Sequence, residues 1–182
     1  MSTYQAVSGA GAWGLWELDD QIKAYAAGQP IHKKKFPHPI VNNLFSHNSA
    51  VAANGYNEEE NKMVNETRKI FHCPEMLVTA TCVRVPVPRA HSEAINLQFT
   101  RPITEQQVRE ILAHAPGVTI VDDRAANHFP MPAEASGQDN VLVGRIRQDV
   151  SQPDGCGIEL FVSGDQIRKG AATNAVQIAE RL

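Results

Sequence analysis

The sequence lacks the features that mark membrane, secreted and nucleic-acid-binding proteins. No apolar run among its 182 residues is long enough to cross a bilayer, and the first residues lack the basic-then-apolar pattern of a signal peptide. A formal net charge of -3 argues against binding to nucleic acid. We therefore expect a cytoplasmic protein with no membrane or nucleic-acid partner.

Cysteine is also scarce, with only Cys73, Cys82 and Cys156. An odd number without metal-like spacing fits a reducing compartment better than a disulfide framework. His91-Ser92-Glu93 matches the first half of a zinc deaminase signature, but the Pro-Cys-x-x-Cys half is absent. Because no other His or Cys cluster has ligand spacing, we predict no metal site.

Length and an apolar content of 42% fit one compact domain over residues 1–182. Adjacent predicted strands have short connections, so we expect an α+β fold with a mixed, largely antiparallel sheet. Helices would pack on one face and leave the other face available for dimerisation. The periodicity predicts helices at about 11–27, from 57, from 104 and at 167–182, and strands at 77–85, 94–99, 118–122, 140–148 and 157–163.

Local signals also predict where helices begin and which faces they bury. Asn57 with Glu60, and Thr104 with Gln107, have the spacing of side chains that cap a helix start. Apolar residues at helical spacing should face the core. These are Leu15, Leu18, Ile22 and Tyr25 in the first helix, Met63, Val64, Thr67, Ile70 and Phe71 in the second, and Ala172, Ala175, Val176 and Ala179 in the last.

A guanidinium and an imidazole flank a proline-rich bend. Arg84 and His91 lie on either side of Pro86 and Pro88. A straight strand would hold them ~20 Å apart, but prolines end or bend a strand, so we expect both side chains to face one pocket. A fixed cation beside a titratable imidazole suits chemistry on a carboxylate or phosphate.

Other motifs favour plainer interpretations. The segment 9–14 has the glycine spacing of a dinucleotide-binding loop, but the preceding strand is short and the expected acidic residue is missing. We interpret it as a flexible helix entry, at which Ser8, Gly9 and Gly11 could expose amides to an anion. Glu59 and Lys62 stand three apart, and this spacing alone indicates a surface ion pair.

Several blocks of sequence lie along almost the whole chain. They are Tyr4-Gln-Ala-Val-Ser-Gly-Ala-Gly11, Phe45-Ser-His-Asn48, Gly55-Tyr-Asn-Glu-Glu-Glu60, Thr79-Ala-Thr-Cys-Val-Arg-Val-Pro86, Arg89-Ala-His-Ser-Glu93, Val143-Gly-Arg-Ile-Arg147, 166–172 and 174–180. Together, and in this order, they resemble the C-terminal half of aspartate-semialdehyde dehydrogenase. The resemblance implies the catalytic and dimerisation domain of an NADP-dependent enzyme of amino-acid biosynthesis, which interconverts aspartyl phosphate and its semialdehyde.

The resemblance implies a role for each of five residues. His91 would be the acid/base that moves a proton, and Gln5 would orient the substrate near the nucleophile. Arg84 would bind the substrate carboxylate. Glu59 would face the substrate amine and Lys62 its phosphate. The resemblance therefore favours a substrate-binding role for Glu59 and Lys62 over an ordinary surface ion pair.

The redox parts of the family have no counterpart in the sequence. The Rossmann half and the Asn-Cys motif with the nucleophile would precede residue 1, and none of Cys73, Cys82 and Cys156 occupies that motif. Cys82 lies in the predicted strand 77–85 and is expected to be buried. Ser8, Gly9 and Asn174 would border the nicotinamide only if the NADP domain were supplied. We therefore expect no cofactor in the isolated chain and no dehydrogenase reaction by it alone.

Two further interpretations stay open. Trp13 and Trp16 stand where the family has small or flexible residues, and they could line an aromatic binding site. The chain could thus be a stand-alone domain repurposed for cofactor-free acid/base chemistry on a carboxylate-bearing substrate, aromatic or not. It could also be a non-catalytic dimerisation module. We expect a homodimer, and a small carboxylate-bearing ligand if the domain is enzymatic.

Overall fold

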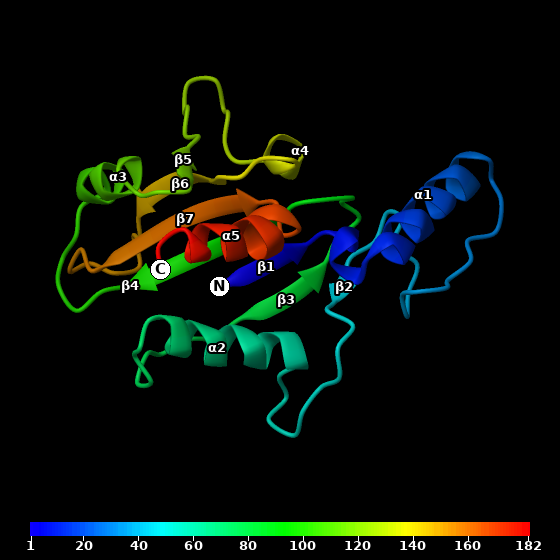
Figure 1. The fold of residues 1–182 in the computed structure, drawn as a ribbon, viewed down its shortest axis with the longest axis horizontal. Helices are drawn as coiled ribbons and strands as arrows, with labels where there is room; N and C mark the ends of the chain where they lie inside the picture. Colours follow the sequence, from blue (N-terminus) through cyan, green and yellow to red (C-terminus); the bar gives the residue numbers. More distant parts are fainter. The chain divides into compact units, whose positions relative to one another are not determined.

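The computed structural model describes residues 1–182, which divide into two compact units, Met1–Pro88 and Arg89–Leu182 (Figure 1). Both units combine helices with strands that pair in parallel and antiparallel fashion, so the predicted α+β class with a mixed sheet is confirmed. A single domain over 1–182, and helices gathered on one sheet face, stay predictions. No helix combines the length and the apolar character needed to span a membrane.

The first unit has short strands. Strand β3 lies in the middle, parallel to β1 and antiparallel to β2, and the register sets Gln5 and Phe45 beside Arg84. A small apolar cluster of Val7, Leu18, Phe36 and Ile40 forms its core. The elements are β1 (Ser2–Gln5), the 3-10 helix η1 (Val7–Ala10), α1 (Ala12–Ala26), β2 (Phe45–Ser46), α2 (Glu58–Ile70) and β3 (Thr81–Arg84).

The second unit has longer strands. Strands β4 and β7 pair antiparallel over their full length, β7 and β6 pair antiparallel with a bulge, and β5 runs parallel to β6. Its core contains Val108, Val143, Ile146, Ile158 and Leu160. The elements are β4 (His91–Gln98), α3 (Glu105–Ala113), β5 (Val118–Ile120), α4 (Pro132–Ala135), β6 (Val141–Gln148), β7 (Gly157–Gly164), the π-helical turn η2 (Arg168–Ala172) and α5 (Thr173–Ala179).

Both predicted helix caps are confirmed. The Asn57 side chain accepts a hydrogen bond from the Glu60 amide at 2.9 Å, and Glu60 accepts one from the Asn57 amide at 2.9 Å. Thr104 and Gln107 exchange the same pair of bonds at 3.2 and 2.9 Å. Glu60 also accepts a bond from the amide of buried Cys82 at 3.0 Å, which ties α2 to β3.

The predicted buried helix faces are only partly correct. Helix α1 buries Leu18 as expected, but Tyr25 is 62% exposed. The other buried residues of α1 are Gly14, Glu17 and Gln21. Glu17 and Gln21 are buried because their side chains bind the backbone of the loop that follows. In α2, Phe71 after the last turn is 67% exposed.

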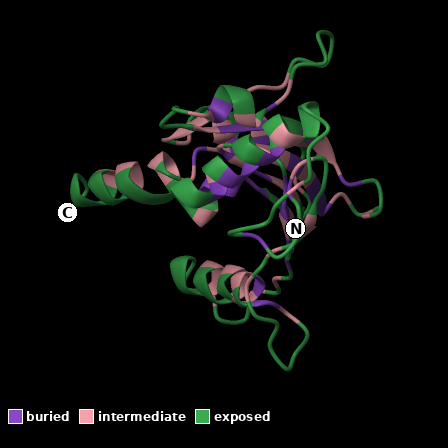
Figure 2. Ribbon diagram, turned by 90° about the vertical axis from the view of Figure 1, so that its right-hand side faces the viewer, coloured by how far each residue is buried: buried purple, intermediate pink, exposed green.

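The C-terminal helix also departs from its predicted packing. Helix α5 has no buried residue, and Val176 is 58% exposed; Figure 2 shows the mainly exposed C-terminal segment. Apolar spacing predicted a core-facing side, but these side chains have no core to cover within the described chain.

The strand predicted over 77–85 is shorter in the structure, where β3 covers only Thr81–Arg84.

The glycine-rich entry to α1 has two steric requirements. Gly11 adopts a φ of 80°, which favours glycine, just before the helix begins. A Cβ on Gly14 would come within 2.4 Å of the Val7 carbonyl oxygen. The motif is therefore a tight junction between η1 and α1, in agreement with a helix entry rather than a dinucleotide-binding loop.

Candidate functional site

Strands β1 and β3 position two of the predicted site residues next to each other. Gln5 and Arg84 are register partners on neighbouring parallel strands, so their side chains point to the same face of the sheet. Both residues are buried. The first unit thus holds an amide and a guanidinium side by side where the two strands end.

Helix α2 adds the other two substrate-binding candidates. The Gln5 Nε2 donates to Glu59 Oε1 at 3.2 Å, and Lys62 Nζ lies 3.1 Å from Glu59 Oε2. The capping box at Asn57 fixes the start of α2 and hence the first turn that carries Glu59. The structure therefore brings Gln5, Glu59 and Lys62 into one hydrogen-bonded chain.

Arg84 is a buried cation without a carboxylate partner. Its side chain donates to the Ala6 carbonyl oxygen at 2.6 Å and lies 5.8 Å from the centre of the Phe36 ring. It is only 3% exposed, and its Nε has no hydrogen-bond partner. Burial lowers the pKa of Arg84, yet a guanidinium keeps its proton near neutral pH. A buried charge of this kind favours an anionic ligand.

His47 also belongs to the cluster, although the sequence pattern around it did not predict a functional role. Its Nε2 lies 2.8 Å from an Arg84 guanidinium nitrogen, and its Nδ1 lies 3.1 Å from the Ser49 hydroxyl. Burial, and next the charge of Arg84, lower the pKa of His47, so the neutral ring accepts from Arg84. The family resemblance could have identified His47, since it lies in the matching block 45–48.

The charges of Glu59 and Lys62 support each other. Burial raises the pKa of Glu59, but hydrogen bonds from Lys62 and Gln5 and the Lys62 charge outweigh it, and the net pKa is lowered. The same contact raises the pKa of Lys62. Near neutral pH the site therefore presents a carboxylate and an ammonium group close together, which suit a substrate with both signs of charge.

His91 lies in the second unit, at the start of β4. It lines a cavity of about 280 Å³ together with Glu93, Asp165, Gln166 and Lys169. Burial raises the pKa of the Glu93 carboxyl in this cavity. Because His91 and Arg84 belong to different units, their predicted shared pocket stays a prediction.

The predicted cofactor-border residues have different surroundings. The amide of Ser8 donates to the Pro88 carbonyl oxygen at 3.1 Å, and that of Gly9 to the Ala6 carbonyl oxygen at 3.2 Å. The idea that these amides are open to an anion is therefore wrong, because the chain itself uses them. Asn174, on α5, lines a cavity of about 520 Å³ in the second unit.

Metal ligation has no candidate cluster in the described chain. No group of three His, Cys, Asp or Glu side chains is arranged to hold an ion. Cys73, Cys82 and Cys156 are all free thiols. Cys82 is fully buried, as expected for a structural residue.

Comparison with known proteins supports the family resemblance. The family described as semialdehyde dehydrogenase, dimerisation domain, matches residues 1–169. Aspartate-semialdehyde dehydrogenase from Synechocystis is 54% identical over the full chain, which covers 53% of that relative. The relative from Aquifex aeolicus is 50% identical, again over the full chain and 53% of its own length.

Solved structures agree with the sequence relatives. The structure of aspartate semialdehyde dehydrogenase II from Vibrio cholerae complexed with ASA has a TM-score of 0.93 and 44% identity, over 98% of this chain and 52% of that one. A probable aspartate-semialdehyde dehydrogenase from Pseudomonas aeruginosa has a TM-score of 0.89 and 30% identity, over 100% and 53%. The chain therefore spans about half the length of these relatives.

Proposed function

Because the chain belongs to the semialdehyde dehydrogenase dimerisation-domain family, we propose that it binds the substrate of an aspartate-semialdehyde dehydrogenase and forms its dimer contact. The proposal includes a homodimer in the cytoplasm and a small carboxylate-bearing ligand. The observation that carries it is Arg84, a buried guanidinium that no carboxylate neutralises.

The substrate carboxylate would pair with Arg84. The contacts from Arg84 to Ala6 and His47 hold its plane in one orientation, and pairing with a carboxylate is a charge-assisted interaction. His47 is a positioning residue in this proposal, since it acts through Arg84. A carboxylate would offset the cost of keeping the cation buried.

The other end of the substrate would meet α2. Glu59 would accept from the substrate ammonium group, and Lys62 would bind the phosphate. Gln5 would orient the substrate, because it lies beside Arg84 on the neighbouring strand and its side chain donates to Glu59 at 3.2 Å. Together these groups match an amino acid with a second, reactive end.

His91 would transfer the proton, and the hydride would be supplied by the reduced cofactor, NADPH, bound to the half of the enzyme that relatives carry outside the matched region. Ser8, Gly9 and Asn174 would border the nicotinamide. Since the amides of Ser8 and Gly9 are already bonded, this loop would offer the ring van der Waals contact, and exposed Gly9 adds no side chain to obstruct it. The chain alone would not turn over the semialdehyde.

A ligand series tests the binding roles. L-aspartate carries the α-carboxylate and the amine, succinate lacks the amine, and β-alanine lacks the α-carboxylate. Arg84→Gln should weaken aspartate and succinate by roughly 10- to 100-fold and leave β-alanine unchanged. Glu59→Gln should weaken aspartate and β-alanine by about tenfold and spare succinate. Equal loss for all three ligands in both variants would contradict the assignment.

A control and a complementation assay complete the test. Lys23→Gln changes an exposed ion pair on α1 and should leave all three affinities unchanged. The N-terminal half of the Synechocystis relative, added in trans, should restore NADP-linked turnover that His91→Ala removes. Conversion without NADP that also depends on His91 would favour the repurposed domain. Dimer formation with neither activity would favour a dimerisation module.

A further inference from the structure

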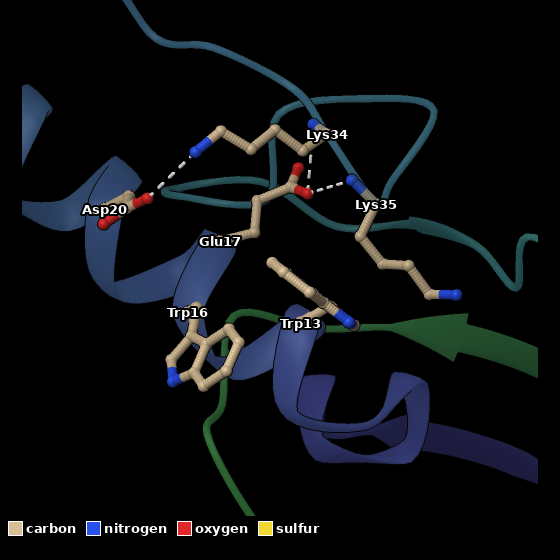
Figure 3. Close-up of a pocket in the computed structure, with 6 residues that line it drawn as sticks. All are labelled: Trp13, Trp16, Glu17, Asp20, Lys34 and Lys35. Atoms are coloured by element: carbon tan, nitrogen blue, oxygen red, sulfur yellow. Dashed lines mark hydrogen bonds and ion pairs between the residues drawn. The ribbon is translucent and has the colours of Figure 1, made fainter.

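The two tryptophans of the chain line a cavity on α1 that the proposed function does not use (Figure 3). The rings of Trp13 and Trp16 are nearly perpendicular, at 87°, with their centres 4.9 Å apart. Both are exposed, so they form two apolar walls open to solvent. The cavity has a volume of about 340 Å³ and is lined by Trp13, Trp16, Glu17, Asp20, Lys34 and Lys35.

The carboxylates of this cavity are already engaged. Glu17 Oε2 accepts from the amides of Lys34 at 3.1 Å, of Phe36 at 3.3 Å and of Lys35, and Glu17 Oε1 accepts from the Gln21 side chain at 3.0 Å. Asp20 pairs with the Lys34 ammonium group at 3.3 Å. A cationic ligand would therefore have to displace contacts that stabilise the loop.

The polar groups of the cavity that make no hydrogen bond within the protein are all hydrogen-bond donors. The Lys35 ammonium group has no hydrogen bond or ion pair, and neither indole N–H has a partner. In Figure 3 the Lys35 side chain leaves the loop beside the Glu17 carboxylate and extends away from it. The Lys35 ammonium group complements an acceptor with negative charge, and the indole walls complement a flat apolar ring.

We propose that this cavity binds a small aromatic carboxylate, with the ring packed against the Trp13 and Trp16 indoles and the carboxylate paired with Lys35. The volume is at the lower end of the range for ligand pockets, which suits a molecule of one or two rings. Because Lys35 is exposed, the ion pair adds little, and the expected dissociation constant is on the order of 1 mM.

The indole N–H signals in a heteronuclear NMR spectrum give a direct readout, since the chain has only these two tryptophans. Benzoate is the probe, benzamide removes its charge, and acetate removes its ring. We expect saturable shifts of both indole signals with benzoate, and affinities roughly threefold to tenfold weaker for benzamide and acetate. L-aspartate should leave both signals unmoved, whatever happens at Arg84.

Two lysine variants separate the site from general charge. Lys35→Gln should weaken benzoate roughly threefold to tenfold. Lys33→Gln is the matched control, because Lys33 donates to the Pro37 carbonyl oxygen at 2.9 Å and does not line the cavity. The proposal is overturned by the absence of saturation at about tenfold the expected constant, or by equal effects of the two variants. Indole shifts that follow protein concentration without ligand would also overturn it, by marking a contact between copies.

Discussion

The first unit buries polar side chains around short strands, whereas the second unit buries mainly apolar ones beneath long strands. In the first unit Gln5, Glu17, Gln21 and Arg84 are all buried, and each binds a loop, a carbonyl oxygen or another side chain. In the second unit the strands from β4 to β7 cover a cluster that includes Ile146 and Ile158. Buried polar groups specify geometry at an energetic cost, so the first unit is suited to recognition and the second to support.

The second unit also buries polar residues, namely Ser92, Asp149, Ser163 and Asp165, and Asp165 is its most deeply buried charged group. It is fully buried, lies 2.7 Å from Arg89, and accepts from the amides of Gly137, Ile167 and Arg168 at 2.6, 3.0 and 3.3 Å. This carboxylate connects the end of β7 with the turns beside α4 and η2. Testing it shows whether the second unit also depends on a polar centre.

Asp165→Asn should have the largest effect, with a loss of about 2–3 kcal/mol in unfolding free energy. The substitution replaces the buried carboxylate that pairs with Arg89 by a neutral amide. Burial opposes ionisation of Asp165, but its hydrogen bonds outweigh this and lower its pKa below the ordinary 3.8. Its stabilisation is therefore complete above that value and is lost as pH falls through the lower folded pKa.

Denaturant unfolding at several pH values measures both parts of this expectation. Asp139→Asn is the control, since Asp139 is an exposed partner of Arg168 and its replacement should leave stability nearly unchanged. A loss below ~1 kcal/mol for Asp165→Asn would mean that apolar packing alone maintains the second unit.

Glu17→Gln tests the polar centre of the first unit. Replacing the carboxylate weakens its bonds to the amides of residues 34–36, and we expect a loss of about 1–2 kcal/mol. Hydrogen exchange at those amides should accelerate more than exchange in β4 and β7. Asp19→Asn, at an exposed position on the same helix, should leave this exchange unchanged. Equal acceleration in both units would contradict a local role.

The two helix caps allow a direct comparison between the units. Asn57→Ala should cost about 1–2 kcal/mol, because Asn57 is buried and its cap partner Glu60 also binds β3. Thr104→Ala should cost only about 0.5–1 kcal/mol, since the Thr104 cap is exposed. Thermal or denaturant unfolding of the two variants checks the order, and a larger loss for Thr104→Ala would reverse the comparison.

The smallest expected effect concerns the charge state of His47. Its pKa should lie below the ordinary 6.5, because burial and Arg84 disfavour the imidazolium. A depressed histidine pKa means that stability declines as pH falls below 6.5 and levels off below the folded pKa. An NMR titration of the His47 ring measures this directly. Arg84→Met should raise the midpoint of this titration, because it removes the neighbouring positive charge.

Much of the fold could be predicted from local sequence. The capping pairs at Asn57 and Thr104 predicted two helix starts, and alternating or β-branched runs predicted most strands of the second unit. A short strand was expected before the glycine-rich segment, where β1 lies, but β2 was not predicted, since a two-residue segment carries no periodic signal. The faces of α1 and α5 were partly wrong, because apolar spacing does not reveal whether another element covers a helix.

For the candidate site, the family resemblance selected Gln5, Glu59, Lys62 and Arg84, while spacing alone interpreted Glu59 and Lys62 as a surface pair. Their contacts within the first unit agree with a common role. His47 could not be found by spacing, because 36 residues of chain lie between it and its partner Arg84. Only strand pairing brings such distant residues together.

The amino-acid sequence by itself determined the helix caps, the glycine-dependent entry to α1, the strand-forming runs and the family. These depend on neighbouring residues or on a pattern along the chain. Only the tertiary structure decided that the Glu17 carboxylate is consumed by backbone amides, that the Ser8 and Gly9 amides are occupied, and that Arg84 is buried with a histidine and no acid. Hydrogen-bond partners and burial depend on which distant segments meet, and local residue preferences do not contain that information.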